Sequence, residues 1–154
     1  MMMGKRMMRS GFLPMLFALL FFLVVQFLLG MYINLYVTIP AMYGFSMMGF
    51  EPLYSGFPIV MAHMFLGILI GLTSIGILIL SVGTGSRRIM LGSAGLFLSV
   101  LLAGIDGLFF LFDGQNNLNS YLMSTGFILA MLFSILLLIY AGPGNANDGM
   151  GMHH

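Results

Sequence analysis

One histidine and one aspartate have the clearest potential for chemistry in this chain, because both stand in long apolar runs. His63 is the only histidine outside the last two residues and lies in the segment MAHMFLG. Asp106 lies in the segment AGIDGLF. An ionisable side chain within a bilayer is costly and marks a candidate functional site. The pair therefore predicts a site that binds a proton or a ligand, provided that both segments cross a membrane.

The composition indicates that lipid is the solvent of this protein. Of the 154 residues, 60% are hydrophobic and only 6% are charged, whereas a soluble domain has about 25% charged residues. The chain has no cysteine, which excludes disulfides, thiolate metal sites and a cysteine nucleophile. No face rich in lysine or arginine is wide enough for nucleic acid, so we expect no nucleic-acid partner.

Four apolar runs predict the fold class: an all-α, polytopic membrane protein built as an antiparallel bundle of four transmembrane helices. The predicted spans are 12–38, 58–81, 89–112 and 121–140, and about 20 apolar residues suffice to cross the hydrocarbon core. The short second and third connections favour antiparallel neighbours. The membrane domain is thus 12–140, between a basic segment 1–11 and a flexible tail 141–154, and the apolar loop 39–57 is predicted to lie on the membrane surface.

The start of the chain has two interpretations. Lys5, Arg6 and Arg9 precede an apolar run, as in a signal peptide, but the run exceeds the roughly 7–15 residues of a signal peptide's apolar region and no small-x-small cleavage site follows. We expect a retained transmembrane helix, with Pro14 in its first turn, where the missing N–H costs little.

The basic residues predict the orientation. With the N-terminus in the cytoplasm, four spans place the Arg87-Arg88 turn and the C-terminus there too, so all five Lys and Arg residues lie on the inner side. This is the positive-inside pattern. It predicts a multi-pass protein of the cell membrane with both termini cytoplasmic.

The topology places several polar residues at one depth. His63 lies about five residues, and Asp106 about seven, inside the outer ends of their spans, which corresponds to roughly 7 and 10 Å. Asn34 in the first span and Ser124 and Thr125 in the fourth fall near this level. The hypothesis is a polar layer in which Asp106 pairs with His63 and the other three complete the site. The alternative is that these groups lie at the headgroups, with Asp106 reaching outward.

Small residues recur at the spacing of helix contacts. Close backbone approach drives association where lipid is the solvent, so the spacings predict tight contact among the second, third and fourth helices. The alternative is that small residues are simply common in membrane helices. The predicted packing positions are Gly67 and Gly71, Ala103 and Gly107, and Gly126, Ala130 and Ser134.

Two metal-based interpretations of His63 stay open. The first is haem, with His63 as one axial ligand and Met61, Met64 or a loop methionine as the second. The second is copper, because imidazole and thioether ligands suit Cu(I) and the chain has 17 methionines. Methionine also packs well in apolar surroundings, which explains most of them without a metal.

Two short motifs carry a resemblance. QFLLG (26–30), followed by HMFLG (63–67), resembles the start of one four-helix half of the haem A synthase family. The resemblance implies a haem-ligand position at His63. The chain has Met64 where that family has arginine, and lacks its Glu-x-x-x-His motif and second ligating histidine. The arrangement, with Asn34 and Pro40, also resembles small uncharacterised four-helix membrane proteins of bacteria and archaea, which implies no function.

These observations leave three classes of function. The first is an accessory or assembly subunit of a larger, redox-linked membrane complex, the second is a haem-binding membrane protein, and the third is a transporter of protons, cations or a metal such as copper. The expected partners are the lipid bilayer and other membrane subunits, or further copies of the chain. Without a Ser-His-Asp set or a phosphate loop, the sequence favours a protein that is not an enzyme.

Overall fold

The computed structural model describes residues 2–38, 56–112 and 116–142, and within these ranges the protein is all-helical. The four helices are α1 (Met2–Tyr36), α2 (Phe57–Thr84), α3 (Arg87–Phe112) and α4 (Asn117–Ala141). The predicted outer loop lies outside the described residues except at its two ends, and so does the predicted flexible tail beyond Gly142. The predicted fold class is confirmed.

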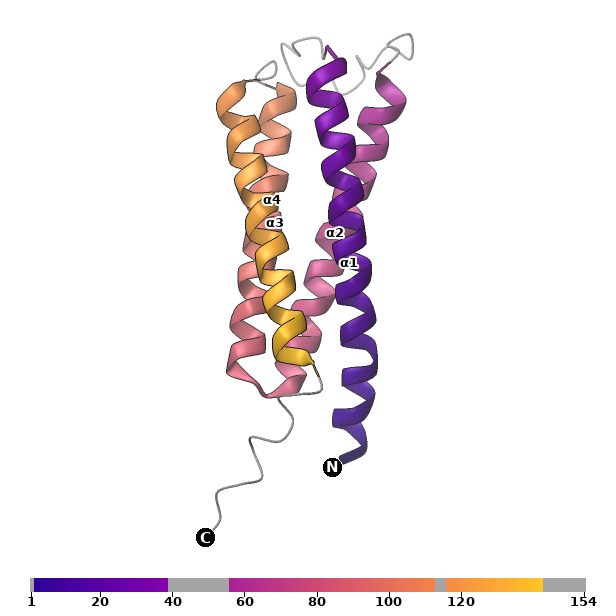
Figure 1. Cartoon of the computed structure of the whole chain (residues 1–154), viewed down its shortest axis with the longest axis vertical. Helices are drawn as coiled ribbons and strands as arrows, with labels where there is room; N and C mark the ends of the chain where they lie inside the picture. The colour runs from indigo at the N-terminus through magenta and orange to yellow at the C-terminus, as the bar shows by residue number, and fades with distance from the viewer. Residues whose placement is uncertain (1, 39–55, 113–115, 143–154) are drawn as a thin grey trace.

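The helices form an up-and-down bundle in which each helix contacts its neighbours in the chain and α4 returns to α1 (Figure 1). Of these four contacts, that between α3 and α4 is the most extensive and that between α1 and α4 the least extensive. Across the α1–α4 contact, the rings of Phe27 and Phe127 stack with centroids 5.1 Å apart. The start of α1, the α2–α3 turn and the end of α4 lie at one end of the bundle, and the start of α4 lies at the other (Figure 1).

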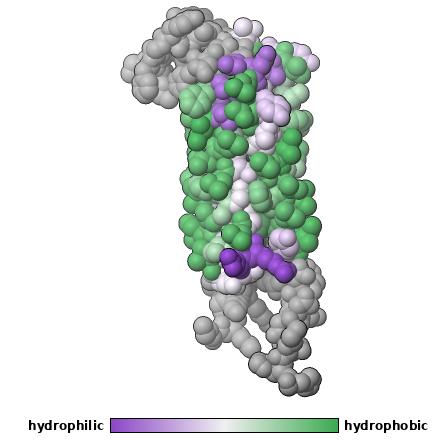
Figure 2. All heavy atoms as spheres, turned by 90° about the vertical axis from the view of Figure 1, so that its left-hand side faces the viewer, coloured by the Kyte–Doolittle hydropathy of each residue, from purple (hydrophilic) through white to green (hydrophobic). Residues whose placement is uncertain are grey.

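All four helices are long and apolar enough to cross a membrane. The candidate spans are Gly11–Tyr36, Pro58–Thr84, Arg87–Phe110 and Asn117–Ala141. Large apolar side chains are exposed on every helix, among them Phe21, Phe65, Leu98 and Ile128. Hydrophobic side chains cover most of the α3–α4 side of the bundle, with hydrophilic groups near its two ends (Figure 2). The protein is therefore an integral, multi-pass membrane protein in contact with lipid.

Local sequence signals define the helix ends. Pro58 occupies the first turn of α2, where a missing N–H leaves no hydrogen bond unmade. α2 ends at Gly85, whose φ of 68° lies in the left-handed region that glycine adopts without strain, and whose N–H donates to the Val82 carbonyl. At the start of α4, the Asn116 side chain accepts a hydrogen bond of 2.9 Å from the Leu118 N–H.

Pro14 lies in the interior of α1 and not in its first turn. The prediction was wrong because the helix begins at Met2, so that the basic residues near the N-terminus belong to the helix as well. At this position the proline ring removes the N–H that would bond to the carbonyl of Ser10.

Glycines bring α3 and α4 together along most of their length. A Cβ atom built on Gly126 would lie 2.8 Å from the backbone nitrogen of Ala103 and 2.9 Å from the carbonyl oxygen of Ser99. Further along the same contact, Leu137 packs over Gly92 and Phe133 over Gly95. Because helices in lipid associate through close packing, this run of small residues explains why the α3–α4 contact is the most extensive.

The predicted packing positions differ in what they contact. Gly67 faces the side chain of Gln26, Gly107 faces Met123, and a Cβ atom on Gly71 would meet nothing within 4 Å. Ala130 is buried in the hydrophobic core. Ser134 is fully buried, and its hydroxyl donates to the Ala130 carbonyl within α4.

We expect Gly126→Ala to destabilise the bundle by about 1–3 kcal/mol, because the new methyl group meets backbone atoms of α3 that cannot rotate away. Unfolding of the purified protein in mixed micelles with increasing denaturing detergent measures this. Gly104→Ala is the matched control: its methyl group meets nothing within 4 Å, so its effect should stay within about 0.5 kcal/mol. Equal effects of the two substitutions would contradict the proposed close contact.

Candidate functional site

His63 lies on α2, half-buried, with its ring directed toward α1. Its Nε2 atom is 3.2 Å from Nε2 of the Gln26 side-chain amide. Away from water, polar groups are stable only where they find a partner. The Gln26–His63 hydrogen bond supplies one between two helices of opposite direction, and is thus an interhelical contact within the membrane-spanning region.

Two glycines make room for this hydrogen bond. A Cβ atom on Gly30 would lie 3.1 Å from Cε1 of His63, and a Cβ atom on Gly67 would lie 3.2 Å from Nε2 of Gln26. Each helix therefore presents a polar side chain and, four residues later, a glycine. Since α1 and α2 are antiparallel, His63 of α2 packs on Gly30 of α1, and Gln26 of α1 packs on Gly67 of α2.

The hydrogen bond defines the state of the imidazole. With the Gln26 amide assigned so that its NH₂ group faces the ring, Nε2 of His63 accepts, and the proton of the neutral ring is on Nδ1. His63 Nδ1 and Gln26 Oε1 are both buried, and neither has a hydrogen-bond partner in the part of the chain that the structure describes. The pair thus retains one donor and one acceptor that a water molecule or a small polar ligand would satisfy.

Asp106 is buried, with 6% of its surface exposed, and its Oδ2 atom has no hydrogen-bond partner among the described residues. It shares a helical face with Ser99 and Ala103, seven and three residues earlier, and both of these contact Gly126 of α4. This face of α3 packs on α4 at Ser99 and Ala103, and one turn beyond Asp106 its Phe110 packs with Ile33 of α1 and Val60 of α2.

The expected His63–Asp106 pair does not occur among the interactions of the described residues, since the ring of His63 bonds to Gln26 instead. The difference arises from rotation about the helix axis. Depth along the bundle, which the sequence provides, does not decide which neighbour a side chain faces.

The other members of the predicted layer are exposed or make local hydrogen bonds. Asn34 is exposed. The Ser124 hydroxyl donates to the Ser120 carbonyl at 2.8 Å, and the Thr125 hydroxyl donates to the Tyr121 carbonyl at 3.0 Å. Hydroxyl groups in membrane helices commonly satisfy themselves in this way, so both of these hydrogen bonds stay within α4.

The two methionines nearest to His63 in the sequence lie on α2 with it. Met61 and Met64 are partly buried, and Met64 packs against the apolar cluster of Ile33, Val60 and Phe110. Among the described residues no three His, Cys, Asp or Glu side chains gather where they would hold a metal ion. The methionines of the outer loop and the Met and His residues of the tail lie outside the described residues.

Haem fits His63 poorly as the side chain is placed. Nε2 is within hydrogen-bonding distance of Gln26, Nδ1 is buried, and the ring lies over Gly30. An axial ligand needs a free ring nitrogen directed at the iron. His63 would therefore have to leave Gln26 before it bound haem.

Gln26 is the site residue that the sequence-based prediction of the polar layer omitted. Its signal was present in the spacing. Gln26 and Gly30 are four residues apart, and so are His63 and Gly67 on the next span. Two consecutive antiparallel helices thus each carry a polar residue followed by a glycine at this spacing. The pattern indicates that the polar side chain of each helix packs on the glycine of the other.

Comparison with protein-family models, with curated proteins and with solved structures found no match. The function must therefore be inferred from the geometry of the chain itself. In that geometry, His63 joins two helices, and Asp106, the one acidic residue of the described chain, is buried at a different contact.

We expect the Gln26–His63 pair to show a coupling energy of about 0.6–1.7 kcal/mol, the range of interhelical hydrogen bonds within a membrane. The double-mutant cycle of Gln26→Ala, His63→Ala and the combined variant, unfolded in mixed micelles, measures it. A parallel cycle with His63→Ala and Asp106→Ala should give a coupling energy near zero. Coupling confined to the His63–Asp106 cycle would show that the sequence-based pairing was right.

Proposed function

We propose that the protein is an accessory or assembly subunit of a larger complex in the plasma membrane. The observation that supports this most is the use of His63, whose Nε2 atom holds α1 to α2 through Gln26 and whose Nδ1 atom is buried. Exposed apolar side chains on all four helices offer surface to lipid and to other membrane subunits. A redox-linked complex is the first kind to test, given the resemblance to a haem-handling family.

We also propose that both termini face the cytoplasm. Arg87 and Arg88 are exposed at the end of the bundle where α1 begins and α4 ends, whereas Asn116 and Asn117 are exposed at the other end. Positive charge is retained on the cytoplasmic side during insertion. This arrangement supports a cytoplasmic α2–α3 turn and an external start of α4.

Because the chain has no cysteine, single cysteines report the orientation directly. In intact cells a membrane-impermeant maleimide should label Asn117→Cys and leave Ser86→Cys unlabelled until the membrane is permeabilised. The reverse pattern would invert the proposed topology.

A second candidate function, proton or cation handling, is favoured by Asp106. A buried carboxyl group without a hydrogen-bond partner for Oδ2 among the described residues is costly in a membrane-spanning helix. Such groups commonly mark ion paths and proton relays. In this protein, Asp106 of α3 would bind the proton or cation, and His63 would take no part.

Purification in a mild detergent, with size, subunit composition and visible spectrum recorded together, tests the proposed function. We expect a colourless protein that co-purifies with membrane partners in fixed stoichiometry after cross-linking in the native membrane. A Soret band that is lost in His63→Ala would establish haem binding instead. A colourless oligomer free of partners would favour transport over an accessory role.

Asp106→Asn separates the two colourless alternatives, because it removes the ionisable group at nearly constant volume. For an accessory subunit we expect the partner stoichiometry and the activity of the parent complex to be unchanged. For proton or cation handling we expect pH-gradient-driven or cation-driven flux in proteoliposomes to be lost, while the amount of folded protein stays the same.

A further inference from the structure

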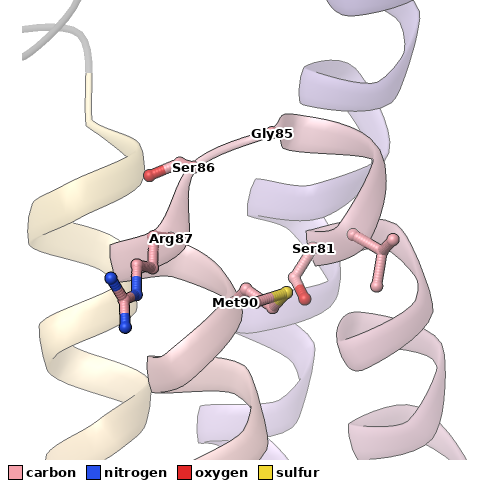
Figure 3. Close-up of a pocket in the computed structure, with 6 residues that line it drawn as sticks. Ser81, Gly85, Ser86, Arg87 and Met90 are labelled. Carbon is pink, nitrogen blue, oxygen red and sulfur yellow. The ribbon is translucent and has the colours of Figure 1, made fainter.

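A small pocket lies at the α2–α3 turn, far from the polar groups discussed above. It has a volume of about 160 Å³ and is lined by Ser81, Val82, Gly85, Ser86, Arg87 and Met90. Ser81 and Met90 lie within it, Gly85 and Ser86 form the turn at its edge, and the Arg87 guanidinium extends from the first turn of α3 (Figure 3). A water molecule occupies about 30 Å³ of liquid volume, so the pocket has room for a phosphate group.

The position of the pocket coincides with the edge of the membrane. The α2 span ends at Thr84 and the α3 span begins at Arg87, so the turn between them lies where the hydrocarbon core gives way to the headgroups. On the hydrocarbon side of the turn, Val82, Met90 and Leu91 are 64%, 41% and 59% exposed. The pocket beside Arg87 therefore continues into an apolar surface, as a phospholipid does from headgroup to acyl chain.

The charge at this turn has no partner within the described chain. Arg87 and Arg88 are both exposed, and no ion pair with a described carboxylate satisfies either. Asp106, the one acidic residue among the described residues, lies 19 residues further along α3 than Arg87, about 28 Å at 1.5 Å per residue. A guanidinium group without a carboxylate partner at the headgroup level is suited to phosphate, which it binds through two parallel hydrogen bonds.

A neutral donor completes the polar part of the pocket. The Ser86 N–H donates to the Thr84 hydroxyl at 3.2 Å, and the Ser81 hydroxyl donates to the Leu78 carbonyl at 2.6 Å. The Ser86 hydroxyl makes no hydrogen bond to another described residue and is directed outward from the turn, on the side where the Arg87 guanidinium also extends (Figure 3). Arg87 and Ser86 thus provide a charged and a neutral donor on the same side of the turn, next to the pocket (Figure 3).

We propose that this pocket binds the phosphate headgroup of an anionic membrane lipid, with Arg87 as the principal contact. Arg87 and Ser86 bind the phosphate, and the exposed Val82, Met90 and Leu91 contact the upper acyl chains. Basic pockets between membrane helices are known to take anionic headgroups in this way. Arg88 also carries a positive charge beside the turn, but it does not line the pocket.

This difference between the two arginines provides the test. The full-length protein is purified, and binding of phosphatidylglycerol and of phosphatidylcholine is titrated by native mass spectrometry. We expect Arg87→Gln to weaken phosphatidylglycerol binding about fivefold to tenfold, as for the loss of one charge-assisted contact. Arg88→Gln, which removes the same charge, should change it less than twofold, and neither variant should alter phosphatidylcholine binding.

Equal losses in the two variants would overturn the proposal, because they would show general attraction of the lipid to a basic end without a site. Displacement of the lipid by millimolar inorganic phosphate would also overturn it, since the occupant would then be a free anion. Arg87→Lys provides a second measurement that keeps the charge and removes the planar fork. Its affinity should fall between those of the native protein and Arg87→Gln, and native affinity in the lysine variant would argue against a bidentate contact.

Discussion

The absence of a hydrophobic driving force between helices in lipid is the constraint on which this structure depends. Lipid tails solvate leucine and phenylalanine as well as another helix does, so helices associate where their backbones approach closely or where polar groups find partners. The bundle uses both means at separate contacts. Gly126 brings the backbones of α3 and α4 together, and the Gln26–His63 hydrogen bond joins α1 to α2.

The two means differ in what they leave unsatisfied. The close approach of α3 and α4 at Gly126 depends on the shapes of two backbones and uses no polar side chain. The contact between α1 and α2 contains buried atoms with unused hydrogen-bonding capacity, Gln26 Oε1 and His63 Nδ1. The described part of α3 adds two further such atoms, Ser93 Oγ and Asp106 Oδ2. Unused capacity of this kind is where a protein in lipid holds a water molecule or an ion, or receives a polar group from a partner.

Polarity at the two ends of the bundle follows a simpler rule. Hydrophilic groups lie near each end of the α3–α4 side, with an apolar surface between them (Figure 2). Arg87 and Arg88 mark the α2–α3 turn, and Asn116 and Asn117 mark the start of α4. The arginines support the proposed orientation, and Arg87 carries the proposed lipid site. The asparagines begin α4, where Asn116 caps the first turn.

Membrane character, the number of helices and their approximate limits could all be predicted from the amino-acid sequence, because each depends on the length of an apolar run and on the residues that interrupt it. The sequence also identified His63 and Asp106 as rare polar groups in apolar segments. The sequence did not identify the partners of these two residues. The position of a residue in an apolar run indicates its depth in the bilayer, but not which neighbouring helix its side chain faces. Only the packing of the helices established that His63 faces Gln26 and Gly30 on α1. It also established that Asp106 shares a face with the residues that contact Gly126. Asn34, in contrast, is exposed. Rotation is set by where the glycines of neighbouring helices allow close approach, which is a property of pairs of helices and not of any one segment.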